Sequence, residues 1–177
     1  PRDPGGATMM GVTLATFRRW HPGATKDDLR AISNADLEKI YRVGYWNPAR
    51  AEELPAGVDL SVFDFGVNSG VSRASKHLQA VSGVKQDGVI GPATISAVNK
   101  MDAASVVKAV CARRLSFVRG LKTWSTFGRG WSRRIAEIEA RGVRMAGATK
   151  VTLDLEAKSA AAKSKTQGGA ASAAGGA

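Results

Sequence analysis

The chain has 177 residues, of which 44% are hydrophobic and 23% charged, a balance that is typical of a globular domain and excludes a disordered chain. It contains no run of about 18 apolar residues, so we expect no membrane span. Cys111 is the only cysteine, which excludes an intramolecular disulfide and a cysteine-ligated zinc cluster. His21 and His77 lack the spacing of metal ligands, and no metal or organic cofactor is expected.

The charge is strongly positive and unevenly distributed. Lysine and arginine number 26 against 15 acidic residues, and the net charge of +11 favours a polyanion as partner: nucleic acid, anionic lipid or the acidic polymers of a bacterial wall. Between Cys111 and Met145, nine basic residues face only Glu137 and Glu139, a net charge of +7. The nine are Arg113, Arg114, Arg119, Lys122, Arg129, Arg133, Arg134, Arg141 and Arg144. This stretch is either an ordinary solvated helix face or an attachment surface for something acidic.

Helix signals dominate the first third of the chain. Thr13 is a suitable N-cap for a helix over 14–20, which the "HPG" at 21–23 ends. Thr25 and Asp28 form a variant of the capping box before a second helix, and Ser33 and Asp36 repeat the pattern before a third. Two prolines and a glycine between 47 and 58 then predict a loop.

The rest of the chain also reads as helices. An apolar helix is predicted from Asp59 to a turn at 68–70, and another over 71–83. Pro92 is well placed at the first position of a further helix. Apolar spacing predicts a long amphipathic helix over 102–121, in which Cys111 is expected to be a core residue rather than a nucleophile. The last helix is predicted over about 131–145.

Composition changes after residue 148, where the sequence becomes rich in Ala, Gly, Ser and Lys with few large apolar residues. Such a segment cannot bury enough surface to offset its ordering entropy, although its alanines permit transient helix. We therefore divide the chain into a first lobe at 1–58, a helical lobe at 59–147 and a flexible tail at 148–177. A membrane anchor or another segment beyond the tail stays open.

The stretch "DPGGATMMGVT", from Asp3 to Thr13, resembles the D-x-G-G-x-T-x-x-G-[IV]-T motif of glycoside hydrolase family 108, which comprises lysozyme-like N-acetylmuramidases. Residues 45–70, 78–98 and 111–134 resemble further segments of that family in the same order, the middle one being its peptidoglycan-binding segment. The resemblance implies a mainly α, α+β lysozyme-like fold with a small β-hairpin near the N-terminus. The active-site cleft should lie between that hairpin and the helices that follow.

The resemblance also implies roles for several residues. The family's catalytic acid is a Glu ahead of the position that Asp3 matches, so we expect that Glu to lie upstream of this chain. Asp3 would be the second catalytic carboxylate, against the alternative of a turn-opening aspartate, and Thr8 would help to hold a water, against a plain strand threonine. Gly5 and Gly6 would let a sugar approach the backbone closely, or would simply form a hairpin turn.

Other residues have both a substrate-binding and a structural interpretation. Tyr45 and Trp46 could stack on sugar rings, although core packing is the commoner role at helical spacing. Asn68 either lines the cleft or stabilises the turn in which it lies. Asp64, inside an apolar helix, needs a partner if it is buried. The "DGVIGPAT" element at 87–94 resembles one in peptidoglycan-binding helical modules, and a structural turn explains it fully.

The function that follows is peptidoglycan hydrolysis at the bond between N-acetylmuramic acid and N-acetylglucosamine, by a monomer that acts in the periplasm or at the cell wall. The alternative is a non-catalytic cationic protein that binds peptidoglycan. Nucleic acid is not an expected partner, because no reading helix, stacking platform or zinc site is present. The stereochemical course, the phage or bacterial origin and the export route stay open.

Overall fold

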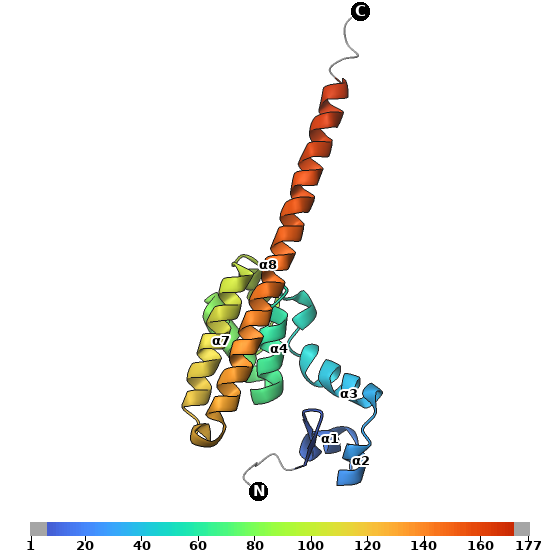
Figure 1. The fold of residues 1–177 in the computed structure, drawn as a ribbon, viewed down its shortest axis with the longest axis vertical. Coiled ribbons are helices and arrows are strands. Elements are labelled where there is room, and N and C mark those ends of the chain that lie inside the picture. Colours follow the sequence, from blue (N-terminus) through green and yellow to red (C-terminus); the bar gives the residue numbers. More distant parts are fainter. Residues whose placement is uncertain (1–6, 172–177) are drawn as a thin grey trace, which may run out of the picture.

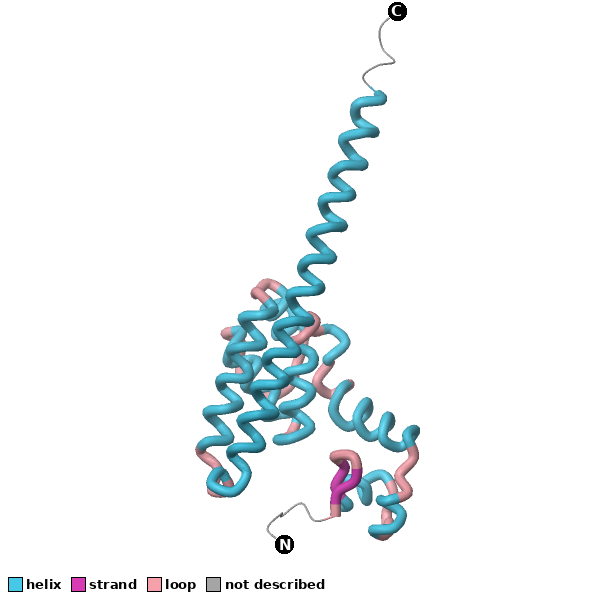
Figure 2. The backbone as a smooth tube through the Cα atoms, viewed as in Figure 1, coloured by secondary structure: helices cyan, strands magenta, loops and turns pink. Residues whose placement is uncertain are grey.

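The computed structural model describes the backbone of residues 7–171 and the side chains of residues 7–158. This part of the chain is mainly helical, with one two-stranded antiparallel sheet, which confirms the predicted fold class (Figures 1 and 2). None of its helices is both long enough and apolar enough to cross a membrane. Asp3, Gly5 and Gly6, the first residues of the hairpin motif, lie outside the described residues.

The small hairpin comes first. Strands β1 (Thr8–Met9) and β2 (Val12–Thr13) pair Thr8 with Thr13 and Met9 with Val12. The two residues of the turn both have a positive φ, 49° at Met10 and 82° at Gly11. Two such residues in sequence are typical of the tight turns that join antiparallel strands, because their twist matches that of the strands.

Three short helices follow, each with the cap that the sequence predicts. They are α1 (Leu14–Trp20), α2 (Lys26–Arg30) and α3 (Asn34–Tyr41). The side chains of Thr13, Thr25 and Ser33 each accept a hydrogen bond from the backbone N–H three residues on. Asp28 completes the capping box, because its carboxylate accepts from the backbone N–H of Thr25 at 2.7 Å. These caps satisfy N–H groups that have no partner within the helix.

The first helices and the hairpin share a small hydrophobic cluster of their own. It consists of Val12, Phe17, Ala24, Leu29, Leu37 and Ile40. A second and larger cluster begins at Ala49 and contains buried residues of the helices that follow, up to Ile135. The division of the chain into lobes at residue 58 stays a prediction, and the two clusters divide between residues 40 and 49.

The connection between the clusters is helical rather than a plain loop. A π-helical turn (Arg42–Trp46) continues α3, and a short 3₁₀ turn (Ala51–Glu53) precedes α4 (Val58–Ser69). Helices α5 (Val71–Ser82), α6 (Pro92–Asn99) and α7 (Ala103–Arg119) follow, and Pro92 occupies the predicted first helical position. Helices α4, α5 and α7 pack around the larger cluster, and α8 runs alongside α7 (Figure 1).

Helix α8 (Trp124–Ala171) is much longer than the predicted helix at 131–145 and projects beyond the rest of the molecule (Figure 1). The segment expected to be a flexible tail is therefore helical as far as Ala171. Ala, Lys, Glu and Leu all favour helix, and no proline interrupts the segment. Packing does not contribute to residues 151–158, whose side chains are all exposed.

The "DGVIGPAT" element is a turn built around the buried side chain of Gln79. Its Nε2 donates to Asp87 Oδ1 at 2.8 Å and to the carbonyl of Val89 at 3.0 Å, and its Oε1 accepts from the N–H of Gly88 at 2.9 Å. Gln79 Nε2 also lies 3.3 Å from Thr94 Oγ1. This network accounts for the polar residues of the motif as parts of a structural turn.

Gln79→Met should lower the free energy of unfolding by about 2 kcal/mol, because it leaves the buried Gly88 N–H without an acceptor. Urea unfolding measures the change. Gln86→Met, at an exposed position of the same turn, is the control and should be nearly neutral. Equal effects of the two substitutions would contradict this account of the turn.

Candidate active-site cleft

A hollow of about 710 Å³ lies where the hairpin turn faces the helical lobe. The turn, the last residue of α3, the C-terminal end of α4 and the first turns of α8 surround it. Its lining residues are Met10, Gly11, Thr13, Tyr41, Val67, Asn68, Thr123, Phe127, Trp131 and Arg134. Another hollow of similar size, about 690 Å³, lies at the other end of α4, away from the hairpin. The position of the first hollow is the one that the resemblance implies for the cleft.

Tyr41 fixes the hairpin turn at the edge of this hollow. Its hydroxyl donates to the backbone carbonyl of Met10 at 2.8 Å. A Cβ atom added to Gly11 would lie 2.5 Å from the same hydroxyl, so only glycine fits there. The side chain of Met10 is 65% exposed, so the turn reaches into solvent beside the cleft.

Aromatic rings of α8 form the opposite wall. Phe127 and Trp131 line the hollow with their ring centroids 5.6 Å apart, and Trp124, which does not line it, lies 6.4 Å from Trp131. Rings that combine an apolar face with a polar edge are suited to the apolar faces of sugars. We did not predict these residues for the cleft. Their spacing at 124, 127 and 131, which places them on one face of a helix, was the available signal.

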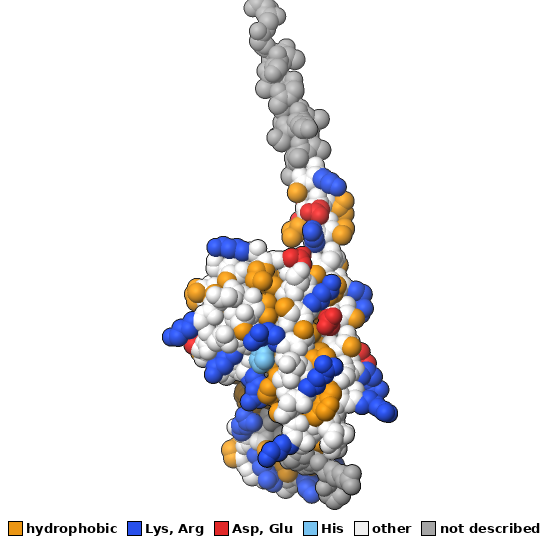
Figure 3. Space-filling view, turned by 90° about the vertical axis from the view of Figure 1, so that its left-hand side faces the viewer, with side chains coloured by type: hydrophobic (Ala, Val, Ile, Leu, Met, Phe, Trp, Pro, Cys, Tyr) orange, Lys and Arg blue, Asp and Glu red, His pale blue; other side chains and the backbone are white. Residues whose placement is uncertain are grey.

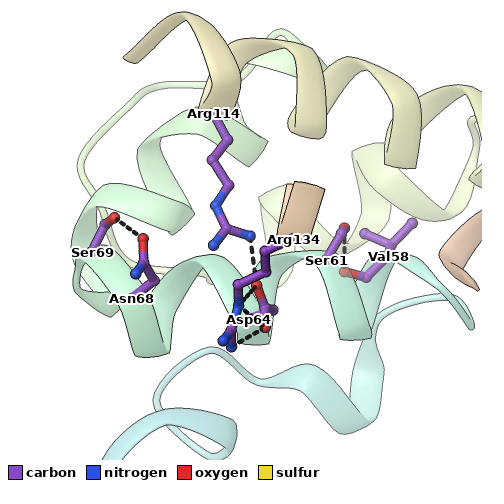
Figure 4. Close-up of polar contacts among 7 residues, drawn as sticks. All are labelled: Val58, Ser61, Asp64, Asn68, Ser69, Arg114 and Arg134. Atoms are coloured by element: carbon purple, nitrogen blue, oxygen red, sulfur yellow. Dashed lines mark hydrogen bonds and ion pairs between the residues drawn. The ribbon is translucent and has the colours of Figure 1, made fainter. Parts of the chain in front are cut away.

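Asp64 is the centre of an ion-pair network behind this wall (Figure 4). The carboxylate is almost fully buried on α4, as the apolar pattern of that helix suggested. Arg114 of α7, 2% exposed, donates to Asp64 Oδ2 at 2.6 Å. Arg134 of α8 donates to Oδ1 through Nη2 at 2.5 Å and through Nε at 3.0 Å. Three helices are thereby joined at one carboxylate.

The network sets the protonation state of Asp64. Burial on its own would raise the pKa of this carboxyl group, but hydrogen bonds from Arg134 and Arg114 and their charges outweigh burial, so the pKa is lowered from its ordinary value of 3.8. Asp64 is therefore ionised at neutral pH and cannot donate a proton to a leaving group. Two guanidinium groups around one carboxylate leave a net positive charge beside the cleft.

The structure brings only some of the predicted site residues to this hollow. Asn68 lines it, and its Oδ1 accepts from the hydroxyl of Ser69 at 3.1 Å. Thr8 is exposed on β1, in the strand that leads into the turn. Their roles in catalysis or binding stay predictions. Among residues 7–158, no group of three or more His, Cys, Asp or Glu side chains is placed to hold a metal ion.

Tyr45 and Trp46 lie elsewhere. Tyr45 lines a separate hollow of about 530 Å³ between α1 and the junction of α4 with α5. The ring of Trp46 packs edge-on against Phe63 at 5.5 Å, and its Nε1 donates to Glu52 at 3.1 Å. Neither residue lines the hollow beside the hairpin. The contacts of Trp46 with Phe63 and Glu52 are sufficient to account for this residue as part of the packing.

Cys111 is a buried core thiol, 1% exposed. Burial, with a smaller contribution from Glu139, raises the pKa of this thiol to about 12. We therefore expect a thiol-specific reagent to label the folded protein very slowly at pH 8 and to label it completely in denaturant. The absorbance of the chromophore that the reagent releases measures the extent of labelling of Cys111, since the chain has no other cysteine. Complete labelling of the folded protein within minutes would contradict the burial.

Comparisons with known proteins agree with the geometry. The family described as "Glycosyl hydrolase 108" matches residues 1–70, and the family described as "Predicted Peptidoglycan domain" matches residues 73–136. The chain is similar to the solved structure of SagA from Brucella abortus, with 45% sequence identity and a TM-score of 0.79. The similarity covers 82% of this chain and 84% of that one. No curated protein matches the chain.

Proposed function

This chain belongs to the glycosyl hydrolase 108 family, and on that basis we propose that it is an N-acetylmuramidase. The family and the peptidoglycan domain that follows it make the chain a peptidoglycan hydrolase. The bond that we assign to it joins N-acetylmuramic acid to N-acetylglucosamine. The observation that carries the proposal is the hollow of about 710 Å³ into which the hairpin turn, Asn68 and the aromatic wall of α8 converge.

Hydrolysis of this bond needs a proton donor for the leaving oxygen and a second carboxylate across the sugar. We assign the first role to a Glu upstream of Pro1, whose pKa would have to be raised to keep it protonated. Asp3 is our candidate for the second carboxylate, and Thr8 for a residue that helps to hold the water. Gly5 and Gly6 would give the sugar room at the backbone. Asp64 is a poor candidate for the acid because it is ionised and paired with two arginines.

The test is the release of reducing sugar from purified peptidoglycan by a chain extended upstream to include the family's Glu. Replacement of that Glu with Gln, or of Asp3 with Asn, should lower the rate by about 10²- to 10⁴-fold. Asp27→Asn is the matched control, because Asp27 is highly exposed and pairs only with Arg30 on the surface. No release of sugar by the extended chain would refute the proposal.

One observation favours a second candidate, a cationic protein that binds peptidoglycan without cleaving it. Figure 3 shows Lys and Arg side chains spread over one face of the molecule. Helices α5 and α7 carry no carboxylate at all and have five exposed basic side chains. These are Arg73, Lys76, Lys108, Arg113 and Arg119. Such a protein would sediment with insoluble peptidoglycan at low salt and be released as salt screens the charges. Retention without sugar release would support this candidate over the enzyme, and either would act in the periplasm or at the cell wall.

A further inference from the structure

Arg134 differs from the other members of the Asp64 network because it reaches solvent. Its side chain is 52% exposed, whereas Asp64 and Arg114 are 9% and 2% exposed at their side chains. It also lines the hollow beside the hairpin, together with Trp131 and Asn68. Figure 4 shows Arg134 and Arg114 meeting Asp64 from different helices. The wall of the cleft therefore contains a cationic side chain, Arg134, whose position is fixed by its hydrogen bonds to the buried Asp64.

The hydrogen bonds leave one edge of that guanidinium available. Nε and Nη2 of Arg134 donate to Asp64, and Nη1 has no hydrogen-bond partner among the described residues. Asp64 is itself held by Arg114, whose side chain is buried. Because an arginine guanidinium is planar and carries five N–H donors, fixing one edge also orients the others.

The charge around Arg134 is not cancelled locally. Asp64 has to neutralise both Arg114 and Arg134, so the network keeps one positive charge. The other groups that act on Arg134 are Tyr41, a phenol, and Glu137. Glu137 lies 3.8 Å from the guanidinium of Arg133, so it already faces another cation. An anion that enters the cleft would therefore meet an uncompensated and oriented positive group.

We propose that Arg134 forms an anion-binding subsite of the cleft that takes a carboxylate carried by the muramic acid residues of the glycan. Muramic acid differs from N-acetylglucosamine by a lactyl ether, which ends in a free carboxylate or in a peptide that bears carboxylates. Arginine binds carboxylates through directed, charge-assisted hydrogen bonds, which fits this ligand. The subsite would distinguish muramic-acid-containing strands from neutral chitin-like strands. The inference rests on the proposed function.

The experiment is a calorimetric titration of three ligands into the protein and its Arg134 variants. Every protein in the series also carries Asp3→Asn, which prevents turnover of the ligand. The ligands are a peptide-free tetrasaccharide with muramic acid, the same glycan with its stem peptides, and neutral chitotetraose. Arg134→Gln should weaken binding of the glycan whose carboxylate occupies the subsite by about 10- to 100-fold, the size expected for a hydrogen bond to a charged group. It should leave chitotetraose binding nearly unchanged. A loss for the peptide-free tetrasaccharide would identify the lactyl carboxylate as the occupant. A loss for the glycan with stem peptides would identify a peptide carboxylate.

Arg129→Gln is the matched control, because Arg129 is exposed on the same helix and does not line the hollow. It should change none of the affinities. Arg134→Lys keeps the charge and should restore part of the lost affinity, which guards against a folding defect in Arg134→Gln. Equal weakening of charged and neutral ligands by Arg134→Gln, or an equal loss in Arg129→Gln, would overturn the subsite alone. Failure of the wild-type cleft to bind any of the glycans would overturn the subsite together with the proposed function.

Discussion

Asp64→Asn should lower the free energy of unfolding by about 3–5 kcal/mol, the usual cost of removing one partner of a buried ion pair. The amide has the shape of the carboxylate but no charge, so Arg114 would be left as an uncompensated cation at 2% exposure. Its Nε already has no hydrogen-bond partner among the described residues. Urea unfolding followed by circular dichroism measures the loss. The change should appear in the midpoint of the transition rather than in its slope.

Two controls isolate the buried charge as the cause. Asp27→Asn removes a carboxylate that pairs with Arg30 at 85% exposure, and it should change stability by less than about 1 kcal/mol. The double variant Asp64→Leu with Arg114→Met removes both buried charges and should recover much of the stability lost by Asp64→Asn. A nearly neutral effect of Asp64→Asn would show that Arg114 finds other compensation, and the network would then not be what joins the helices.

The lowered pKa of Asp64 also predicts a dependence of stability on pH. A carboxyl group whose pKa is lower in the folded than in the unfolded state binds fewer protons when folded, so it adds stability above its unfolded pKa. That contribution is fully present above the ordinary value of 3.8 and is lost as the pH falls through the lowered folded pKa. Thermal unfolding between pH 7 and pH 2 should therefore show an acid loss of stability in wild type that is smaller in Asp64→Asn.

Gly57→Ala is expected to cost about 3 kcal/mol or more, because two unfavourable terms add at this position. Gly57 has a φ of 88°, which an alanine adopts only with strain. A Cβ atom there would also collide with the backbone carbonyl of Gly142 on α8, which cannot move without shifting that helix. Overpacking in a well-packed site costs about 1–3 kcal/mol on its own. The variant should show a lower melting temperature and weaker protection of α8 in hydrogen exchange.

Gly147→Ala is the control on the same helix. Gly147 is exposed, and an added Cβ would meet nothing within 4 Å, so alanine should stabilise α8 by up to about 1 kcal/mol. Gly142→Ala should instead be unfavourable, since its Cβ would lie 2.9 Å from a methyl group of Val107 and 3.0 Å from the carbonyl of Gly57. Opposite signs for two glycines on one helix would establish that close contact with Val107 and Gly57, rather than helix propensity, governs the stability of this region.

Local interactions made much of the fold predictable. The caps at Thr13, Thr25 and Ser33 depend on residues three positions apart, and all three are present in the structure. The Pro92 start and the long amphipathic helix after Asp102 follow from the same short-range rules. The family was identified from four segments that resemble it in the same order, because residues 3–13 alone are too short to be specific. The helical extension beyond residue 148 was missed because alanine-rich segments satisfy the propensity for helix and the composition of a linker equally well.

The cleft itself depends on residues that the chain brings together from far apart. Arg114 and Arg134 reach Asp64 across 50 and 70 residues, and nothing in the local pattern of any of the three helices specifies that pairing. The sequence by itself determined most of the helices and their caps, since each depends on neighbours a few positions away, and the resemblance to the family supplied the hairpin. Only the tertiary structure decided that Trp131, Asn68 and Arg134 share one hollow while Tyr45 and Trp46 do not, because which face of a helix meets a distant partner is set by packing among several helices at once.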